Sequence, residues 1–180
     1  AVSYCKNYND CKPQVSGRVE HFISKNAMDI DKLGPETIKG LIDNKIIKVP
    51  ADLYNIEYND IINLEFKLED KDKVRSLKDK SCNNILTSIE KSKSKPFSNL
   101  LFGLGIRFVG KTTAEKLSNH FKSIDNIIDA SYDEIIEVDE IGEKIAESVK
   151  IFFSDETNIT HIQNLKAAGL KLKEDTFTNE

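Results

Sequence analysis

The sequence of 180 residues contains no tryptophan, one methionine, three cysteines, four prolines and eight glycines. So few glycines and prolines exclude a low-complexity chain. Long apolar runs are also absent: the longest uncharged stretch, residues 96–106, is about half of the ~20 residues that a membrane-spanning helix needs. No basic segment followed by an apolar one opens the sequence, so nothing indicates export. We therefore expect a cytoplasmic protein of one domain or two small ones, without membrane association.

Charge is unevenly distributed, although the formal net charge is only -4. Residues 71–122 carry 12 basic and 4 acidic side chains, whereas residues 123–180 carry 5 basic and 14 acidic ones. A basic segment within an acidic chain is typical of a surface that meets a polyanion such as nucleic acid. A solvated, lysine-rich helix face would give the same asymmetry, so the charge alone does not decide between the two.

Apolar residues recur three and four positions apart along most of the chain, which is the period of an amphipathic helix. No segment alternates apolar and polar residues over six or more positions between turn signals, so we expect no sheet. Ser131 and Glu134 predict a capping box, and Gly169 predicts the end of a helix. The sequence thus predicts an all-α fold of short helices, with a looser segment at residues 1–16 and a tail or linker at 173–180.

Four segments of nine residues align without gaps. Each has an apolar residue, then a glycine or lysine, three mostly polar residues, a small or apolar residue and, three positions later, another apolar residue. The segments are Leu33–Leu41, Leu77–Ile85, Val109–Leu117 and Ile141–Val149. A repeated unit of this kind predicts neighbouring units that share a core. We expect two pairs, over residues 17–95 and 96–172.

This repeat is the signature of the helix-hairpin-helix motif, so the sequence predicts four tandem hairpins. The glycine would let the backbone turn sharply and take dihedral angles that a Cβ atom opposes. The helix that follows presents N–H groups without intrahelical partners, and these suit an oxygen of a DNA phosphate. Contacts of this kind hold the backbone of double-stranded DNA without reading its sequence.

The predicted DNA-binding residues lie at and beside the four turns. The third turn has the most suitable chemistry, because two cations and a threonine surround its glycine. The fourth turn has acidic neighbours, and in the second a lysine replaces the glycine, which puts its phosphate-binding geometry in doubt. The full set is Gly34, Lys78, Lys80, Arg107, Gly110, Lys111, Thr112, Gly142 and Lys144.

Two other functions are compatible with a helical repeat protein. SAM-like domains use similar hairpins to pack helices and bind proteins, so a protein-interaction module without DNA binding is the alternative. An independent enzyme has little support, because the three histidines are scattered along the sequence. No set of residues suited to acid–base or nucleophilic catalysis can be recognised in it. We therefore expect no catalytic residue in this chain.

The three cysteines fall into two groups. Cys5 and Cys11 lie close together, but a structural zinc site takes four ligands and no further cysteine completes it. His21 is a weak candidate ligand, and a disulfide is improbable in the cytosol. We interpret Cys5 and Cys11 as half of a four-cysteine zinc finger within residues 1–16. Cys82 fills the small-residue position of its repeat, so we expect it to be buried.

Several segments resemble bacterial NAD-dependent DNA ligases, in the order in which they occur in that family. The resemblance covers about residues 5–172, and its most specific block is Leu104-Gly-Ile-Arg-Phe-Val-Gly110. Phe108 and Lys78 depart from the family, which often has a polar residue and a small residue at these positions. The other matching segments are 11–14, 21–25, 27–34, Pro50–Tyr54, Ile89–Lys93 and Ala167–Gly169.

The resemblance implies one piece of an enzyme that seals nicks in duplex DNA, in replication and repair, by adenylyl transfers from NAD. The family's adenylated lysine lies in a Lys-x-Asp-Gly motif, and this sequence contains no Asp-Gly dipeptide. The piece would therefore be non-catalytic. The resemblance also implies a monomer that grips the minor groove on both sides of a nick, beside the remaining ligase domains. NAD and magnesium would bind elsewhere in the parent enzyme, and zinc would find only a half site here.

Overall fold

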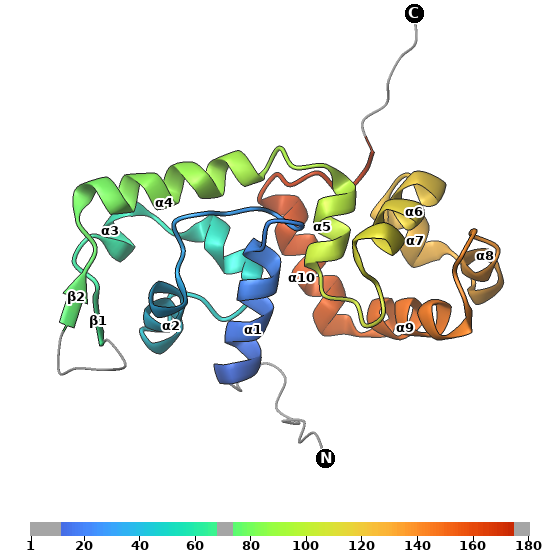
Figure 1. Cartoon of the computed structure of the whole chain (residues 1–180), viewed down its shortest axis with the longest axis horizontal. Helices are drawn as coiled ribbons and strands as arrows, with labels where there is room; N and C mark the ends of the chain where they lie inside the picture. The colour runs from blue at the N-terminus through green and yellow to red at the C-terminus, as the bar shows by residue number, and fades with distance from the viewer. Residues whose placement is uncertain (1–11, 68–73, 175–180) are drawn as a thin grey trace, which may run out of the picture. The chain divides into compact units, whose positions relative to one another are not determined.

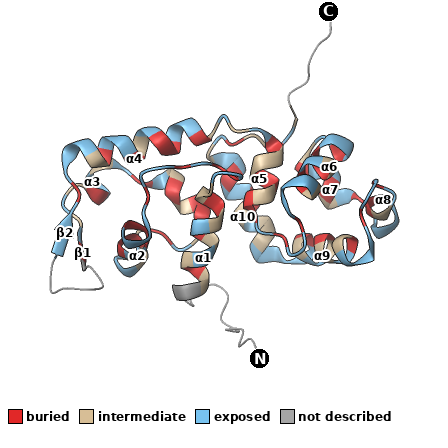
Figure 2. Cartoon of the chain, in the orientation of Figure 1, coloured by how far each residue is buried: buried red, intermediate tan, exposed pale blue. Residues whose placement is uncertain are grey.

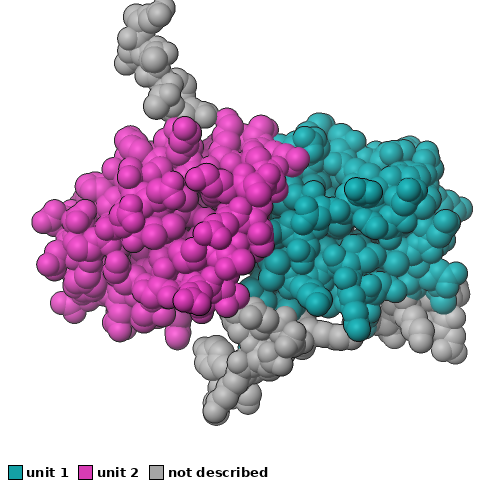
Figure 3. Space-filling model, turned by 180° about the vertical axis from the view of Figure 1, so that it is seen from behind, with its two compact units in different colours: residues 1–25, 29–92 teal, residues 26–28, 93–180 magenta. Residues whose placement is uncertain are grey.

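The computed structural model describes residues 12–67 and 74–174 of the chain. They form two compact units (Figure 3): unit 1 comprises residues 1–25 and 29–92, and unit 2 comprises residues 26–28 and 93–180. Cys5 and Cys11, with most of the predicted zinc-finger segment, lie outside the described residues, as does most of the predicted tail. None of the described helices combines the length and the apolar character that crossing a bilayer requires.

Unit 1 combines helices with one small sheet (Figure 1). Its first helix is α1, where Val15, Val19 and Phe22 recur at helical spacing. All three of these side chains are buried. The elements in chain order are α1 Lys12–Ile23, α2 Pro35–Asp43, the 3-10 helix η1 Pro50–Asn55, α3 Tyr58–Ile61, β1 Glu65–Lys67, β2 Val74–Ser76 and α4 Asp79–Ser92.

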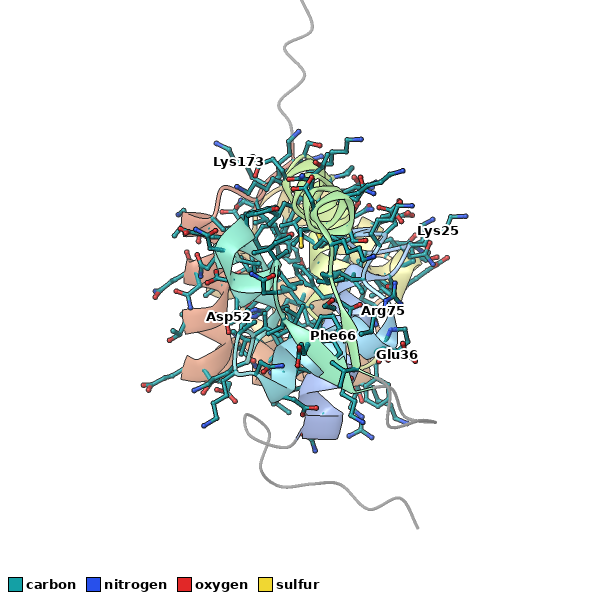
Figure 4. All side chains as sticks on the ribbon, turned by 90° about the vertical axis from the view of Figure 1, so that its left-hand side faces the viewer. Lys25, Glu36, Asp52, Phe66, Arg75 and Lys173 are labelled. Atoms are coloured by element: carbon teal, nitrogen blue, oxygen red, sulfur yellow. The ribbon has the colours of Figure 1, made fainter. Side chains whose placement is uncertain are left out.

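Strands β1 and β2 pair antiparallel, with Phe66 opposite Arg75 (Figure 4). The expectation of no sheet was therefore wrong here. Each strand is only three residues long, so neither can produce the six-residue alternation that would have announced a strand. The Phe66 ring is buried and packs so closely on α2 that a Cβ atom at Gly40 would overlap it.

Unit 2 consists of six helices within the described residues: α5 Phe97–Gly103, α6 Lys111–Phe121, α7 Ile124–Asp129, α8 Tyr132–Ile136, α9 Glu143–Ser154 and α10 Glu156–Ala167. Ser131 is the N-cap of α8, as predicted, because the Glu134 N–H donates to Ser131 Oγ at 3.2 Å. This is one of the two bonds of the predicted capping box; the Glu134 carboxylate accepts a hydrogen bond from Ser131 Oγ. Ser123 and Asp155 cap α7 and α10 in the same manner. Gly169, with φ of 95°, follows the end of α10 as predicted.

The apolar positions of the four repeats belong to the cores of the two units. The first apolar residue of each repeat is between 5% and 7% exposed: Leu33, Leu77, Val109 and Ile141. The small or apolar residue five positions later is almost fully buried in every case: Ile38, Cys82, Ala114 and Ala146. The expected burial of Cys82 is thus confirmed. In Figure 2 such buried segments recur along α4 and α9, between exposed turns of the same helices.

Candidate nucleic-acid interface

The turns before α2, α6 and α9 share one backbone conformation. Two residues before each glycine the backbone is left-handed, and at the glycine it is extended. The φ angles are 72°, 67° and 63° at Lys32, Phe108 and Glu140, and -76°, -85° and -88° at Gly34, Gly110 and Gly142. Three of the four predicted repeats therefore share the backbone conformation of the turn that precedes the second helix.

The expectation that the turn glycine is required for its dihedral angles was wrong. An extended φ is open to any residue, and the left-handed conformation occurs two positions earlier, at residues that are not glycine. A Cβ atom built on Gly34, Gly110 or Gly142 would meet no atom within 4 Å. The missing side chain therefore leaves open space in front of the turn, and the fold does not depend on it.

The helices that follow these turns begin with open N-termini. Gly34, Gly110 and Gly142 are the N-cap residues of α2, α6 and α9, and none of the three caps has a side-chain hydrogen bond. In α6 the first intrahelical bond runs from the Ala114 N–H to the Gly110 carbonyl at 2.9 Å. The preceding N–H groups of the first turn consequently have no acceptor within the helix. Gly110, Lys111 and Thr112 are exposed, so an anion can reach this end of the helix.

The second repeat differs in the structure that precedes its helix. The Cys82 N–H donates to the Lys78 carbonyl at 2.9 Å, so α4 begins in the same register as the other three helices. However, strand β2 ends at Ser76, and no helix leads directly into this turn. The second predicted hairpin is thus a helix behind a β-hairpin. Lys78 and Lys80 are exposed at its start.

Reciprocal contacts link the two turns of unit 2. Lys116 of α6 forms an ion pair with Glu140 in the turn before α9. Ser148 of α9 donates a hydrogen bond from Oγ to the Arg107 carbonyl, in the turn before α6, at 2.5 Å. Lys116 and Ser148 hold equivalent positions, six residues after Gly110 and Gly142. Each hairpin helix therefore contacts the other turn, and the predicted site residues of both turns belong to one connected structure.

A related contact holds the first turn of unit 1. Ser88 of α4 donates a hydrogen bond from Oγ to Asp31 Oδ1 at 2.6 Å. Asp31 precedes Gly34 by three residues, as Arg107 precedes Gly110. This hydrogen bond is the main reason why the pKa of Asp31 lies below its usual value. Ser88 of α4 in unit 1 and Ser148 of α9 in unit 2 therefore each donate a hydrogen bond to the residue three positions before a turn glycine.

The charge beside the four helix N-termini is uneven. Glu36, Asp79 and Glu143 lie in the first turns of α2, α4 and α9, whereas the first turn of α6 has no acidic residue. A carboxylate there interacts favourably with the helix dipole and competes with an incoming anion. Arg107, Lys111 and Thr112 are exposed around the third turn, so that turn offers the most favourable surroundings for a phosphate.

Phe108 was not among the predicted site residues, although the structure places it at the centre of the third turn. Its side chain is 54% exposed, and the Arg107 guanidinium carbon lies 5.0 Å from the centroid of its ring. The signal that could have found it is its position, two residues before Gly110, where the equivalent residues Lys32 and Glu140 are both polar.

No group of three or more histidine, cysteine, aspartate or glutamate side chains in residues 12–67 and 74–174 could hold a metal ion. The predicted zinc ligands Cys5 and Cys11 lie outside these ranges. Cys82 is a free, buried cysteine, and burial raises the pKa of its thiol.

Comparisons with known proteins agree with this geometry. The helix-hairpin-helix motif family matches residues 99–162, which contain both turns of unit 2. The chain therefore contains the motif that the repeat pattern predicted.

The curated relatives narrow the assignment further. The chain is 47% identical over 175 residues to a DNA ligase of Phocaeicola vulgatus, covering 97% of this chain and 25% of the relative. It is 44% identical to a DNA ligase of Flavobacterium psychrophilum and 39% identical to one of a Thermoanaerobacter species, in each case over 96% of this chain and 24% of the relative. The chain is a homologue of one segment of the bacterial DNA ligases, and spans about a quarter of their length. These relatives do not favour the SAM-like alternative.

Proposed function

We propose that this chain is the module with which an NAD-dependent DNA ligase binds nicked double-stranded DNA. The observation that carries the proposal is the pair of linked turns in unit 2, each with free space at its glycine and an open helix N-terminus. Two phosphate sites on one rigid element suit the regular backbone of a duplex. Because such contacts involve the backbone, the binding would be independent of base sequence.

The third turn would bind most strongly. The N–H groups of Gly110, Lys111 and Thr112 would donate to one phosphate, while the side chains of Arg107 and Lys111 add positive charge. A phosphate is doubly favoured there, by the helix dipole and by the absence of acidic residues in the first turn.

The remaining turns would add weaker contacts. Gly142 and Lys144 would hold a second phosphate in unit 2, against the repulsion of Asp139 and Glu143. In unit 1, Gly34 offers the same open turn, and Lys78 and Lys80 supply charge at the start of α4. The four turns would then grip the duplex on both sides of a nick, with the third contributing most.

The activity of the whole enzyme belongs to this proposal and rests on the resemblance to DNA ligases. The parent protein would seal single-strand breaks in replication and repair, using NAD and magnesium bound by other domains, and this segment alone would be non-catalytic. Cys5 and Cys11 would supply two of the four thiolates of a zinc finger. The chain by itself would be monomeric and would act in the cytoplasm.

The test is the salt dependence of binding to a fluorescently labelled nicked duplex, measured by anisotropy. Log K should fall with log[salt] with a slope of about -0.9 for each phosphate neutralised, so two to four contacts give roughly -2 to -4. Lys111→Gln should make that slope shallower by about 0.9, because the variant has one cation fewer and neutralises one phosphate fewer. A matched control is Lys171→Gln, in the segment after α10 and far in sequence from every turn. Binding that does not change with salt would contradict the proposal.

A further inference from the structure

Phe108 is the one phenylalanine among the described residues with more than half of its surface exposed. A single exposed apolar side chain is common on protein surfaces and carries no meaning by itself. Phe108 has the left-handed backbone of the equivalent residues in the other two turns, with φ of 67°, but it is the only aromatic residue of the three. A bulky aromatic residue at positive φ is strained, and strain of this kind occurs where function requires it. The equivalent turn positions hold Lys32 and Glu140, which are polar.

Two neighbouring contacts fix how Phe108 is presented. Arg107 covers one side of the ring, with its guanidinium carbon 5.0 Å from the ring centroid, a distance typical of a cation–π pair. The Arg107 carbonyl accepts the hydrogen bond from Ser148 of α9. The turn therefore presents an aromatic ring and a guanidinium group together, on a backbone that the neighbouring helix holds in place.

The distance along the chain places this pair beside the proposed phosphate site. Two residues span at most roughly 7 Å, so a phosphate held at the Gly110 N–H lies within reach of the Phe108 ring. The sugar and base edge next to that phosphate face the groove. The minor groove of B-DNA is about 6 Å wide, and proteins that bind there insert apolar wedges between base steps and arginines into the groove.

We propose that Phe108 is a minor-groove wedge, which partly unstacks the base step beside the phosphate held by the third turn, while Arg107 occupies the groove next to it. This inference rests on the proposed function, since it needs the duplex to be bound at Gly110. The wedge would favour DNA whose steps separate at low cost, such as a nick or a pyrimidine–purine step. It adds a preference for deformable duplex to a site that otherwise reads only phosphates.

The experiment uses the whole chain and a nicked duplex carrying 2-aminopurine, a base whose fluorescence rises when it is unstacked. The variant is Phe108→Asn, because asparagine accepts a left-handed backbone and should leave the melting temperature unchanged or raised. The matched control is Ile151→Gln, which removes another exposed apolar side chain of unit 2, 64% exposed, from the last turn of α9.

The unaltered chain and Ile151→Gln should both raise the fluorescence on binding. Phe108→Asn should lose that rise and bind about tenfold more weakly. Its salt slope should stay the same, because an apolar contact releases no counterions. Phe108→Tyr, which keeps the ring, should retain most of both signals.

Three outcomes separate the wedge from the binding function. If Phe108→Asn binds as tightly as the unaltered chain, the wedge is wrong while duplex binding stands. If affinity falls and the fluorescence of the unaltered complex never rises, the ring packs on the DNA without unstacking it, and the wedge is again wrong. If the unaltered chain binds no duplex at low salt, the proposed function itself fails, and the wedge fails with it.

Discussion

Unit 2 places both of its turns between helices, whereas unit 1 places one turn between helices and a β-hairpin before α4. Despite this difference, all four repeat helices begin in the same register: the carbonyls of Gly34, Lys78, Gly110 and Gly142 accept the first intrahelical bond, at 2.9 to 3.0 Å. The buried positions of the four repeats also correspond. The comparison shows that the second helix is the constant part of this unit, and that the element before it can be exchanged.

A β-hairpin can stand before α4 in place of a helix because Phe66 of β1 packs against α2. In unit 2 the position six residues after the turn glycine holds Lys116 or Ser148, and each contacts the opposite turn. In unit 1 the same position is Gly40, and the Phe66 ring occupies the space that a side chain would take. A strand that carries one large aromatic residue can therefore cover the surface of α2 that a short helix would otherwise cover.

The largest effect is expected at Gly40. Gly40→Ala should destabilise unit 1 by about 1–3 kcal/mol, because the new methyl group overlaps the Phe66 ring. The loss should appear although alanine is the better helix former, by about 1 kcal/mol. Gly142→Ala is the control, since its Cβ meets no atom within 4 Å. Urea unfolding measures both; a Gly40→Ala protein of raised stability would show that the ring moves away at little cost.

A substitution in the third turn should separate binding from folding. Gly110→Val should weaken nicked-duplex binding at least tenfold, since the side chain fills the space in front of the open N–H groups. Its helicity should be unchanged, because valine readily adopts the extended backbone found there, with φ of -85°.

Gly34→Val makes the corresponding change in unit 1, and we expect a smaller loss there because Glu36 already weakens that site. Gel shifts and circular dichroism measure the two properties. Equal losses from the two variants would mean that both units contribute alike to binding, and unchanged affinity of Gly110→Val would remove the third turn from the site.

The two serine contacts should differ in their pH dependence. The pKa of Asp31 is lowered mainly by the Ser88 hydrogen bond, so this contact stabilises the protein above the unfolded pKa of about 3.9 and is lost as pH falls through the folded value. Ser88→Ala should therefore cost more stability at pH 7 than at pH 2–3. Ser148→Ala should cost about 1 kcal/mol at either pH, because its acceptor is a carbonyl. Equal pH profiles of the two variants would contradict this assignment.

The last effect should appear only in alkali. Burial raises the pKa of Tyr54 to about 12, and its hydroxyl lies 2.8 Å from Ser92 Oγ. Since the folded pKa lies above the unfolded one, this group stabilises the protein fully below pH 10, and that contribution is lost as pH rises towards 12. Tyr54→Phe should reduce the fall in melting temperature between pH 10 and pH 12. Tyr58, whose hydroxyl donates to Asp79 and whose pKa is also about 12, should account for part of what remains.

The repeats could be predicted because their information is local. The spacing of Val109, Ala114 and Leu117 determines which face of a helix is buried, and the same spacing recurs in each repeat. The β-hairpin could not be predicted, because its strands are three residues long and are stabilised by the contact of Phe66 with a distant glycine. The role of the turn glycines was misjudged for a related reason: the left-handed residue is two positions earlier, and nothing in its residue type reveals it.

The helical character, the four repeat helices with their buried positions, the uneven charge and the likeness to DNA ligases were all determined by the amino-acid sequence alone. They depend on periodicity, composition and residue order, which need no knowledge of distant contacts. Only the tertiary structure decided that one repeat follows a β-hairpin, that α6 and α9 each contact the other's turn, and that Phe108 is exposed beside Arg107. These features depend on which side chains meet across the fold, and contacts between residues distant in sequence leave no periodic signal in it.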